Sequence, residues 1–126
     1  IDIDHFKSYN DNFGHRSGDI VLVHIADLLK GVFNAPHHLV SRFGGEEFFV
    51  LLPMTDKKEA LLLAENLRKG IQDGIIFLRR IPVKITVSIG VASFPSDGSS
   101  WLDLVKHSDA AMYQAKQKGR NRVCCL

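Results

Sequence analysis

Hydrophobic residues recur at helical spacing in three stretches of the chain, residues 16–32, 57–69 and 101–118. Positions three or four apart share one face of a helix, so each stretch predicts a helix with one apolar face. The residues expected to face the core are Leu22, Ala26, Leu29 and Phe33 in the first helix, Ala60, Ala64, Leu67 and Ile71 in the second, and Leu102, Val105, Met112 and Ala115 in the third.

Shorter runs of alternating or β-branched residues predict strands over residues 39–43, 47–52, 83–93 and 122–126. Residues 1–4 are expected to be the end of a strand that runs into a loop. Gly44-Gly45 predicts a hairpin turn, and Gly90 predicts a bulge or kink inside its strand. The order strand, helix, hairpin, helix, strand, helix, strand is typical of an α/β (α+β) domain with a mostly antiparallel sheet and packed helices.

Composition narrows the class of protein. The 126 residues suffice for one domain, 45% of them are hydrophobic, and the formal net charge is only +2. This low net charge argues against a nucleic-acid-binding surface that depends on a high positive charge, but it is compatible with binding of a small nucleotide. No apolar run is long enough for a membrane span, no secretory signal is present, and the adjacent Cys124 and Cys125 suit neither a disulfide nor a metal site. We therefore expect a cytoplasmic domain without membrane contact of its own, whatever anchors the rest of its parent chain.

The first residues that could carry chemistry lie in Asp2-Ile3-Asp4-His5-Phe6-Lys7, followed by Asn10, His15 and Asp19. Asp2 and Asp4 lie on one side of an extended chain, and carboxylates that leave a strand end are usual ligands of hard cations. Taken alone, the segment is better explained as a solvated loop, or by Asp4 as the cap of the next helical turn.

A glycine turn followed by two acids forms the second candidate, Arg42-Phe43-Gly44-Gly45-Glu46-Glu47-Phe48. Glycines at a hairpin tip let the backbone approach a ligand, and core packing gives no reason for two acids between hydrophobic strands. A solvent-exposed turn flanked by charges is an equally good explanation of this segment.

Lys116 and Arg120 form the third candidate, because residues four apart near a helix end can point the same way. Such cations usually just complement the helix dipole, but they can also hold a phosphate tail. Acids for a metal, a glycine turn and paired cations are together the combination that phosphoryl-transfer enzymes use. The chain contains neither G-x-x-x-x-G-K-[ST] nor G-x-G-x-x-G, so a nucleotide would have to be held in another way.

Along its whole length the chain resembles the GGDEF family of diguanylate cyclases. The matching motifs are Arg42–Phe48 (the signature in its Glu variant), Asp2–Lys7 with Asn10-Asp11 and Phe13-Gly14-His15, Val87–Ala92, and Asp109–Tyr113 with Ala115-Lys116 and Gly119-Arg120-Asn121. The resemblance implies a ferredoxin-like βαββαβ fold, the palm of nucleotidyl cyclases. It also implies that residues 1–126 form one GGDEF domain without the family's first helix and the start of its first strand.

The same resemblance implies roles for individual residues. Asp2, the backbone carbonyl of Ile3 and Glu46 would hold Mg²⁺ (or Mn²⁺), and Glu47 would support this metal site. Glu46 would also accept the proton of the ribose 3′-hydroxyl. Asn10 and Asp19 would recognise guanine, with His15 beside the nucleotide. The phosphates would be held by the backbone at His5 and Phe6, by the Gly44-Gly45 turn, and by the side chains of Lys7, Lys116 and Arg120.

The implied reaction joins two GTP molecules into cyclic di-GMP and releases two pyrophosphates. One site that binds one GTP cannot complete it, so two domains would face each other in a homodimer, under control of an upstream sensory or regulatory domain. A degenerate GGDEF domain that binds GTP only as a regulatory module is the alternative, and the intact signature argues against it. A polymerase palm is disfavoured by the nearly neutral charge. The R-x-x-D motif through which family members bind their product is absent, since Ala35-Pro36-His37-His38 stands in its place.

Overall fold

Five of the seven strands form one sheet in the order β2-β3-β1-β6-β7. In the computed structural model, which describes residues 1–126, they are β1 (Asp2–Ile3), β2 (Leu39–Gly44), β3 (Glu47–Leu51), β6 (Val87–Val91) and β7 (Arg122–Cys125). All neighbours run antiparallel except β6 and β7, which are parallel. Strands β1, β2, β3 and β6 therefore have the ferredoxin-like arrangement, and the mostly antiparallel sheet is confirmed.

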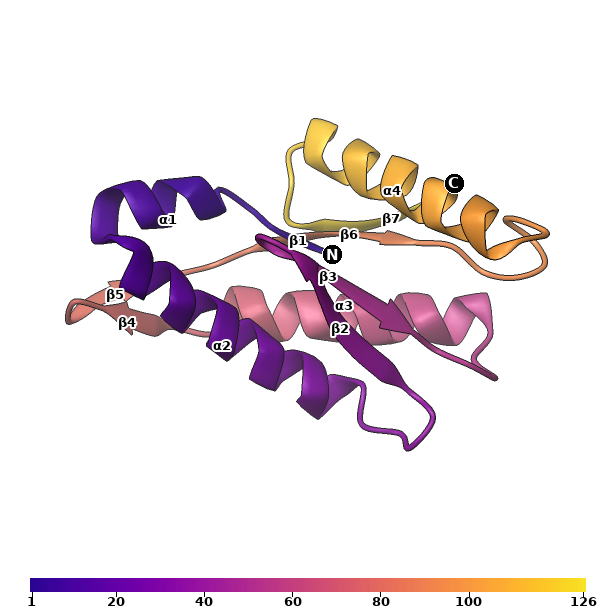
Figure 1. Cartoon of the computed structure of the whole chain (residues 1–126), viewed down its shortest axis with the longest axis horizontal. Helices are drawn as coiled ribbons and strands as arrows, with labels where there is room; N and C mark the ends of the chain where they lie inside the picture. Colours follow the sequence, from indigo (N-terminus) through magenta and orange to yellow (C-terminus); the bar gives the residue numbers. More distant parts are fainter.

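The four helices are α1 (Phe6–Phe13), α2 (His15–Val32), α3 (Lys57–Asp73) and α4 (Trp101–Gln117). Helices α2, α3 and α4 cover the sheet, and α1 packs against α2. Figure 1 shows α2 and α3 on one face and α4 on the other. None of the four combines the length and the apolar composition that crossing a bilayer requires.

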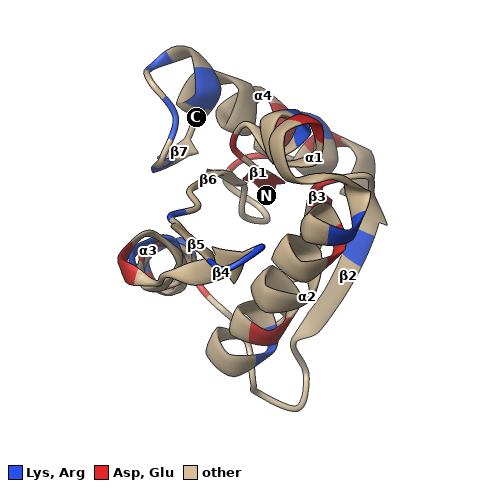
Figure 2. Cartoon of the chain, turned by 90° about the vertical axis from the view of Figure 1, so that its left-hand side faces the viewer, with Lys and Arg blue, Asp and Glu red and all other residues tan.

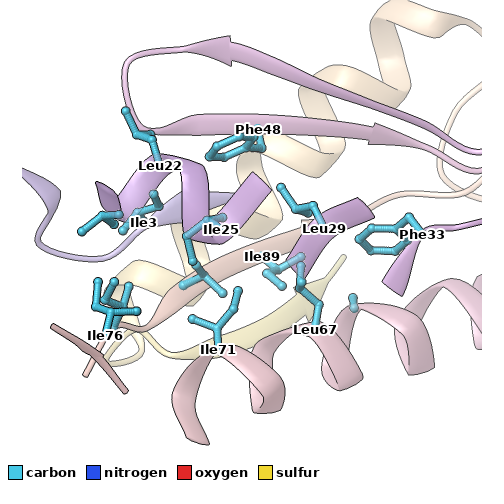
Figure 3. Close-up of a cluster of buried hydrophobic side chains, with 14 of the residues drawn as sticks. Ile3, Leu22, Ile25, Leu29, Phe33, Phe48, Leu67, Ile71, Ile76 and Ile89 are labelled. Carbon is cyan, nitrogen blue, oxygen red and sulfur yellow. The ribbon is translucent and has the colours of Figure 1, made fainter. Parts of the chain in front are cut away.

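The hydrophobic core lies between the sheet and the pair α2 and α3 (Figure 3). Ile25 and Leu29 of α2, Leu67 of α3 and Ile3 of β1 are at most 1% exposed. Each such side chain stabilises the fold by about 1.5–3 kcal/mol relative to an exposed one. Of the residues predicted to face inward, the buried ones are Leu22, Leu29, Phe33, Ala64, Leu67, Ile71, Met112 and Ala115.

Leu102 was predicted to face the core, and this is wrong, since its side chain is 58% exposed. Helix α4 packs on β6 through its later turns, where Ala111 is fully buried. The spacing of the apolar residues in α4 gives the correct helix but does not show where along its length the sheet contact begins.

Two elements were not predicted from the sequence. Helix α1 lies where a loop was expected, and its Phe6, Tyr9 and Phe13 pack half-buried against the core. A two-stranded hairpin, β4 (Ile76–Leu78) and β5 (Ile81–Val83), precedes β6, so the strand predicted over residues 83–93 begins only at Val87. The hairpin was missed because its turn consists of Arg79 and Arg80, both at positive φ, instead of the usual glycine or asparagine.

Gly90 was predicted to mark a bulge or kink, and this is also wrong. The pairing of β6 with β7 runs without a shift from Ser88 to Val91, and the irregularity of the sheet lies in β2 between Arg42 and Gly44. A Cβ atom on Gly90 would lie 1.9 Å from the carbonyl oxygen of Ser108 and 2.5 Å from the amide nitrogen of Met112. Glycine is needed here because the backbone of α4 rests directly on β6.

Candidate active site

A pocket of about 180 Å³ opens where β1 leads into α1, and we call it the β1–α1 pocket. It collects side chains from β1, α1, the β2–β3 turn, α4 and the turn after α4. Its lining residues are Asp2, Ile3, Asp4, His5, Phe6, Lys7, Glu46, Lys116 and Arg120. All of them except Asp4 are residues to which the sequence assigned metal, phosphate or catalytic roles.

The floor of the pocket is acidic, because Asp2, Asp4 and Glu46 line it. Figure 2 shows acidic segments, in red, where β1 and β3 lie side by side. Asp2 of β1 lies directly opposite Glu47 of β3 in the antiparallel register. Side chains at such positions are about 5 Å apart, so two carboxylates there repel each other. The Nζ of Lys116 lies 2.8 Å from Oδ2 of Asp2 and offsets part of this repulsion. Glu47 is thus placed beside Asp2, although it does not line the pocket itself.

Asp4 is fully buried and has a different role from Asp2. Its carboxylate accepts hydrogen bonds from the hydroxyls of Thr86 and Ser88, each at 2.7 Å, and from the backbone N–H of Asn121 at 3.0 Å. The sequence left open whether Asp4 is a metal ligand or a helix cap. The structure shows a carboxylate that joins β1 to β6 and to the start of β7. Thr86 and Ser88 could have been noticed, because hydroxyls two apart in a strand lie on one face.

Helix α1 begins beside the pocket. His5 precedes it in a left-handed conformation, with φ 57°, and no side chain caps the helix start. The first N–H groups of a helix have no partner within the helix, so those at Phe6 and Lys7 are available to an anion. This gives a physical basis for the phosphate contacts expected at His5, Phe6 and Lys7.

The signature turn, residues Gly44–Glu47, is stabilised by hydrogen bonds from the nearby side chain of Arg42. Nε and Nη2 of Arg42 donate to the carbonyl oxygen of Gly45 at 2.9 and 2.7 Å. Gly45 has a positive φ of 53°, and a Cβ on either glycine would meet open space. The backbone N–H of Ile3 donates to the carbonyl oxygen of Glu46 at 3.3 Å, which brings Glu46 to the pocket next to β1.

The turn after α4, Gly119–Asn121, contains Arg120, one of three cationic residues that line the pocket. All three of its residues have positive φ, at 107°, 63° and 46°. The N–H of Arg120 donates to the carbonyl oxygen of Ala115 at 2.9 Å, so the turn folds back on the helix end. Lys116 and Arg120 both line the pocket, as expected, but Arg120 reaches it through this turn and not through helical spacing.

The residues predicted to recognise guanine lie outside the β1–α1 pocket, around the corner between α1 and α2. The side chain of Asn10 packs against Gly18, since a Cβ there would lie 1.9 Å from Oδ1 of Asn10. Exposed Asp19 borders a wider, open hollow of about 410 Å³ along α2, with Ile20, Val23, His24 and Asp27. His15 is exposed at the first residue of α2.

Tyr9 fixes α1 relative to the sheet. Its hydroxyl donates to the carbonyl oxygen of Lys84 at 3.1 Å, just before β6. Burial, and to a lesser extent the negative charge of Asp4, raise the pKa of this phenol above its usual value. Tyr9 therefore stays protonated and keeps α1 in place at neutral pH.

Comparison with known proteins shows the same combination of fold and motifs. The family described as "Diguanylate cyclase, GGDEF domain" matches residues 1–122. The chain is 42% identical over 123 residues to diguanylate cyclase A of Treponema denticola, which covers 98% of this chain and 33% of that protein. It is 40% identical over 124 residues to a diguanylate cyclase of Vibrio cholerae, which covers 98% of this chain and 38% of that protein. The chain thus spans little more than a third of the length of these relatives.

Among solved structures, the chain is similar to the GGDEF domain of DgcB from Caulobacter crescentus, which was determined in complex with c-di-GMP. The TM-score is 0.90 at 35% identity, covering 98% of this chain and 72% of that one. Fold, signature turn and sequence therefore agree, and the chain belongs to the GGDEF family of diguanylate cyclase domains.

Proposed function

We propose that this domain condenses two GTP molecules into cyclic di-GMP and two pyrophosphates. The observation that carries the proposal is the β1–α1 pocket, where Asp2 and Glu46 lie together with the cations Lys7, Lys116 and Arg120. Phosphoryl transfer depends mainly on positioning and on neutralising phosphate charge, and this pocket offers groups for both tasks. A regulatory module that only binds GTP would not need a proton acceptor such as Glu46 at this place.

The donor groups fit a magnesium ion. Mg²⁺ takes oxygen ligands and usually binds one or two carboxylates together with phosphate oxygens. Asp2 and Glu46 supply two carboxylates, and Ile3 can supply its carbonyl. The lysine ammonium already beside Asp2 shows that a positive charge is favourable there. When bound, the ion would neutralise phosphate charge and lower the pKa of the attacking hydroxyl.

Side chains and backbone N–H groups of the domain would accept the proton, bind the phosphates and recognise guanine. Glu46 accepts the proton of the ribose 3′-hydroxyl as that oxygen attacks the α-phosphate of the opposite GTP. The first N–H groups of α1, with Lys7, hold phosphate oxygens, and Lys116 and Arg120 hold the outer phosphates that leave as pyrophosphate. Asn10 and Asp19 recognise guanine, because a carboxylate can accept from its N1–H and N2–H₂ donors.

The stoichiometry of the product requires two sites. Cyclic di-GMP contains two bonds between a 3′-oxygen and an α-phosphate, and each domain holds one GTP. Two copies of the domain must therefore face each other, and each presents its hydroxyl to the other's phosphate. We propose that further parts of the parent chain bring the two copies together and control them.

The experiment is synthesis of cyclic di-GMP from GTP and Mg²⁺ by the full parent protein, measured by chromatography. The variant Glu46→Ala should fold normally and lose activity by ~10² to 10⁴, because a positioned proton acceptor alone contributes this much. Glu59→Ala removes an exposed acid of α3 far from the pocket and serves as the matched control.

Near-normal turnover in Glu46→Ala would contradict the role of Glu46. Tight binding of GTP by the unmutated protein without any product would instead favour the regulatory module. Equal binding of GTP and ATP would remove the basis for assigning Asn10 and Asp19 to guanine.

A further inference from the structure

The turn Gly119–Asn121 is conformationally strained. A glycine adopts a positive φ without cost, but Arg120 at 63° and Asn121 at 46° do not. Non-glycine residues keep such conformations only where the surrounding structure holds them. Because Arg120 lines the β1–α1 pocket, whatever holds this turn also places a cation of the site.

Asn121 is held from two directions. Its backbone N–H donates to Oδ2 of Asp4 at 3.0 Å. Its side chain is bound by α3, where Nη1 of Arg68 donates to Oδ1 of Asn121 at 2.8 Å. Nδ2 of Asn121 in turn donates to Oε1 of Gln72 at 3.0 Å. Both ends of the amide are therefore engaged by residues one helical turn apart on α3.

Arg68 is itself fixed before it reaches the turn. Its Nη2 and Nε donate to the two carboxylate oxygens of Glu65 at 2.7 and 2.8 Å, and Nη1 also donates to Oε1 of Gln72. A bidentate pair of this kind fixes the plane of the guanidinium. The side chain of Arg68 is only 12% exposed, so solvent competes little for these contacts.

We propose that Arg68 is a positioning residue for the active site, acting through Asn121 to hold Arg120 at the pocket. The shared carboxylate of Asp4 extends the same network to β1, which carries Asp2. Arg68 does not line the pocket and does not touch the nucleotide in this scheme. The effect on activity rests on the proposed function, whereas the ordering of the turn does not.

The first measurement is hydrogen exchange of the full parent protein and of its Arg68→Met variant. The segment of residues 118–122 should exchange roughly tenfold faster in the variant, because loss of one partner in a connected network has effects of this size. Lys69→Met removes the neighbouring, exposed cation of α3 and should leave exchange in this segment unchanged. Asn121→Ala removes the same hydrogen bonds from the Asn121 side. If Arg68→Met fails to fold, Asn121→Ala should show the faster exchange of residues 118–122 in its place.

The second measurement is a mutant cycle between Arg68→Met and Arg120→Ala. Each single variant should raise the KM for GTP, with a smaller change in kcat. The double variant should be no worse than Arg120→Ala alone, because Arg68 acts through Arg120. Additive effects, or unchanged exchange in residues 118–122, would overturn the proposal. If the unmutated protein makes no cyclic di-GMP, the proposed function fails, and the exchange data still decide the role of Arg68.

Discussion

The ammonium of Lys116 lies 2.8 Å from a carboxylate oxygen of Asp2, and so links α4 to β1 across the pocket. Asp2 is 9% exposed in its side chain and lies opposite Glu47. Lys116 is therefore the group that compensates this acidic floor in the absence of ligand. In the proposed reaction the same lysine binds a phosphate, so it has to leave Asp2 when GTP and Mg²⁺ arrive.

Replacing Lys116 by Met should change two affinities in opposite directions. The affinity of the nucleotide-free protein for Mg²⁺ should rise, because the ion no longer competes with an ammonium for Asp2. The KM for GTP should rise about tenfold, since a charged hydrogen bond of about 1.5 kcal/mol or more is lost. Calorimetry with Mg²⁺ alone and steady-state kinetics measure the two effects. Lys118→Met is the control, as Lys118 contacts only Gln114; an unchanged Mg²⁺ affinity in Lys116→Met would contradict the competition.

The two aspartates of β1 should respond differently to substitution. Asp4→Ala leaves the hydroxyl of Ser88 and the N–H of Asn121 without their acceptor, and should lower the free energy of unfolding by about 3 kcal/mol or more. Asp2→Ala removes one of two opposed acids, so it should cost less stability and abolish synthesis. Urea unfolding of both variants, beside activity assays, tests this. Equal stability of the two variants would show that the Asp4 network is not important for folding.

Gly18→Ala should separate stability from nucleotide recognition. Alanine is favoured over glycine in a helix interior by up to about 1 kcal/mol. This gain offsets the cost of displacing a neighbouring side chain, so the melting temperature should change little. The new Cβ would lie 1.9 Å from Oδ1 of Asn10, and this side chain must move away. We expect a higher KM for GTP and weaker discrimination against ATP. Gly31→Ala, with open space around its Cβ in the same helix, is the control. Full selectivity in Gly18→Ala would argue against a role for Asn10.

Acid should weaken the loop that connects β6 to α4. Oδ1 of Asp97 accepts from Nζ of Lys57 and Oδ2 from the N–H of Ser93, each at 2.8 Å. Partial burial of Asp97 acts to raise its pKa, but these hydrogen bonds and the charge of Lys57 outweigh it, so the pKa lies below its usual value. A lowered folded-state pKa means that the contribution is present above the unfolded pKa of about 3.9 and is lost as the pH falls through the folded value.

The difference in unfolding free energy between the unmutated protein and Asp97→Asn should accordingly be constant near neutral pH and shrink below about pH 4. Because the side chain of Lys57 is still 30% exposed, solvent screens this ion pair and we expect the difference to be small. Urea titrations from pH 7 to about pH 2.5 measure it. A difference that grows on acidification would reverse the assigned sign.

Feedback inhibition by the product should be absent at the loop between α2 and β2. Ala35 and His38 stand where product-inhibited relatives carry an arginine and an aspartate, and neither can replace them. His38 is half-buried, and its ring packs edge-on against Phe33 with the centroids 6.4 Å apart. Adding cyclic di-GMP should therefore leave the progress curve unchanged. Micromolar product binding that is abolished by His38→Ala, with non-competitive inhibition against GTP, would refute this.

The sequence predicted those parts of the site that depend on local spacing. Lys116 and Arg120 were expected together from their spacing and do line the same pocket, although Arg120 reaches it from the turn after α4, and Glu46 reaches it because a glycine turn precedes it. The role of Asp4 could not be predicted, because its donors Thr86, Ser88 and Asn121 lie 82, 84 and 117 residues further along the chain. Local spacing contains no information on which distant hydroxyls meet a carboxylate.

The errors in the predicted fold have a similar origin. Helix α1 was taken as a loop because its sequence is mostly polar, and it is stabilised by packing of Phe6, Tyr9 and Phe13 on the core and by the hydrogen bond of Tyr9 to Lys84. The β4–β5 hairpin was overlooked because its turn residues, Arg79 and Arg80, are not those that such turns prefer. In both places tertiary contacts override a weak local preference.

Gly90 has a consequence for natural variation in this protein. It has no charge and does not line the β1–α1 pocket, so a comparison of site residues alone would treat it as neutral. Yet its missing side chain sets the height of α4 above β6 at Met112, one helical turn before Lys116. Even alanine at this position would lift the helix and carry the lysine away from Asp2. A homologue that keeps every charged residue but lacks this glycine should therefore be suspected of lost activity.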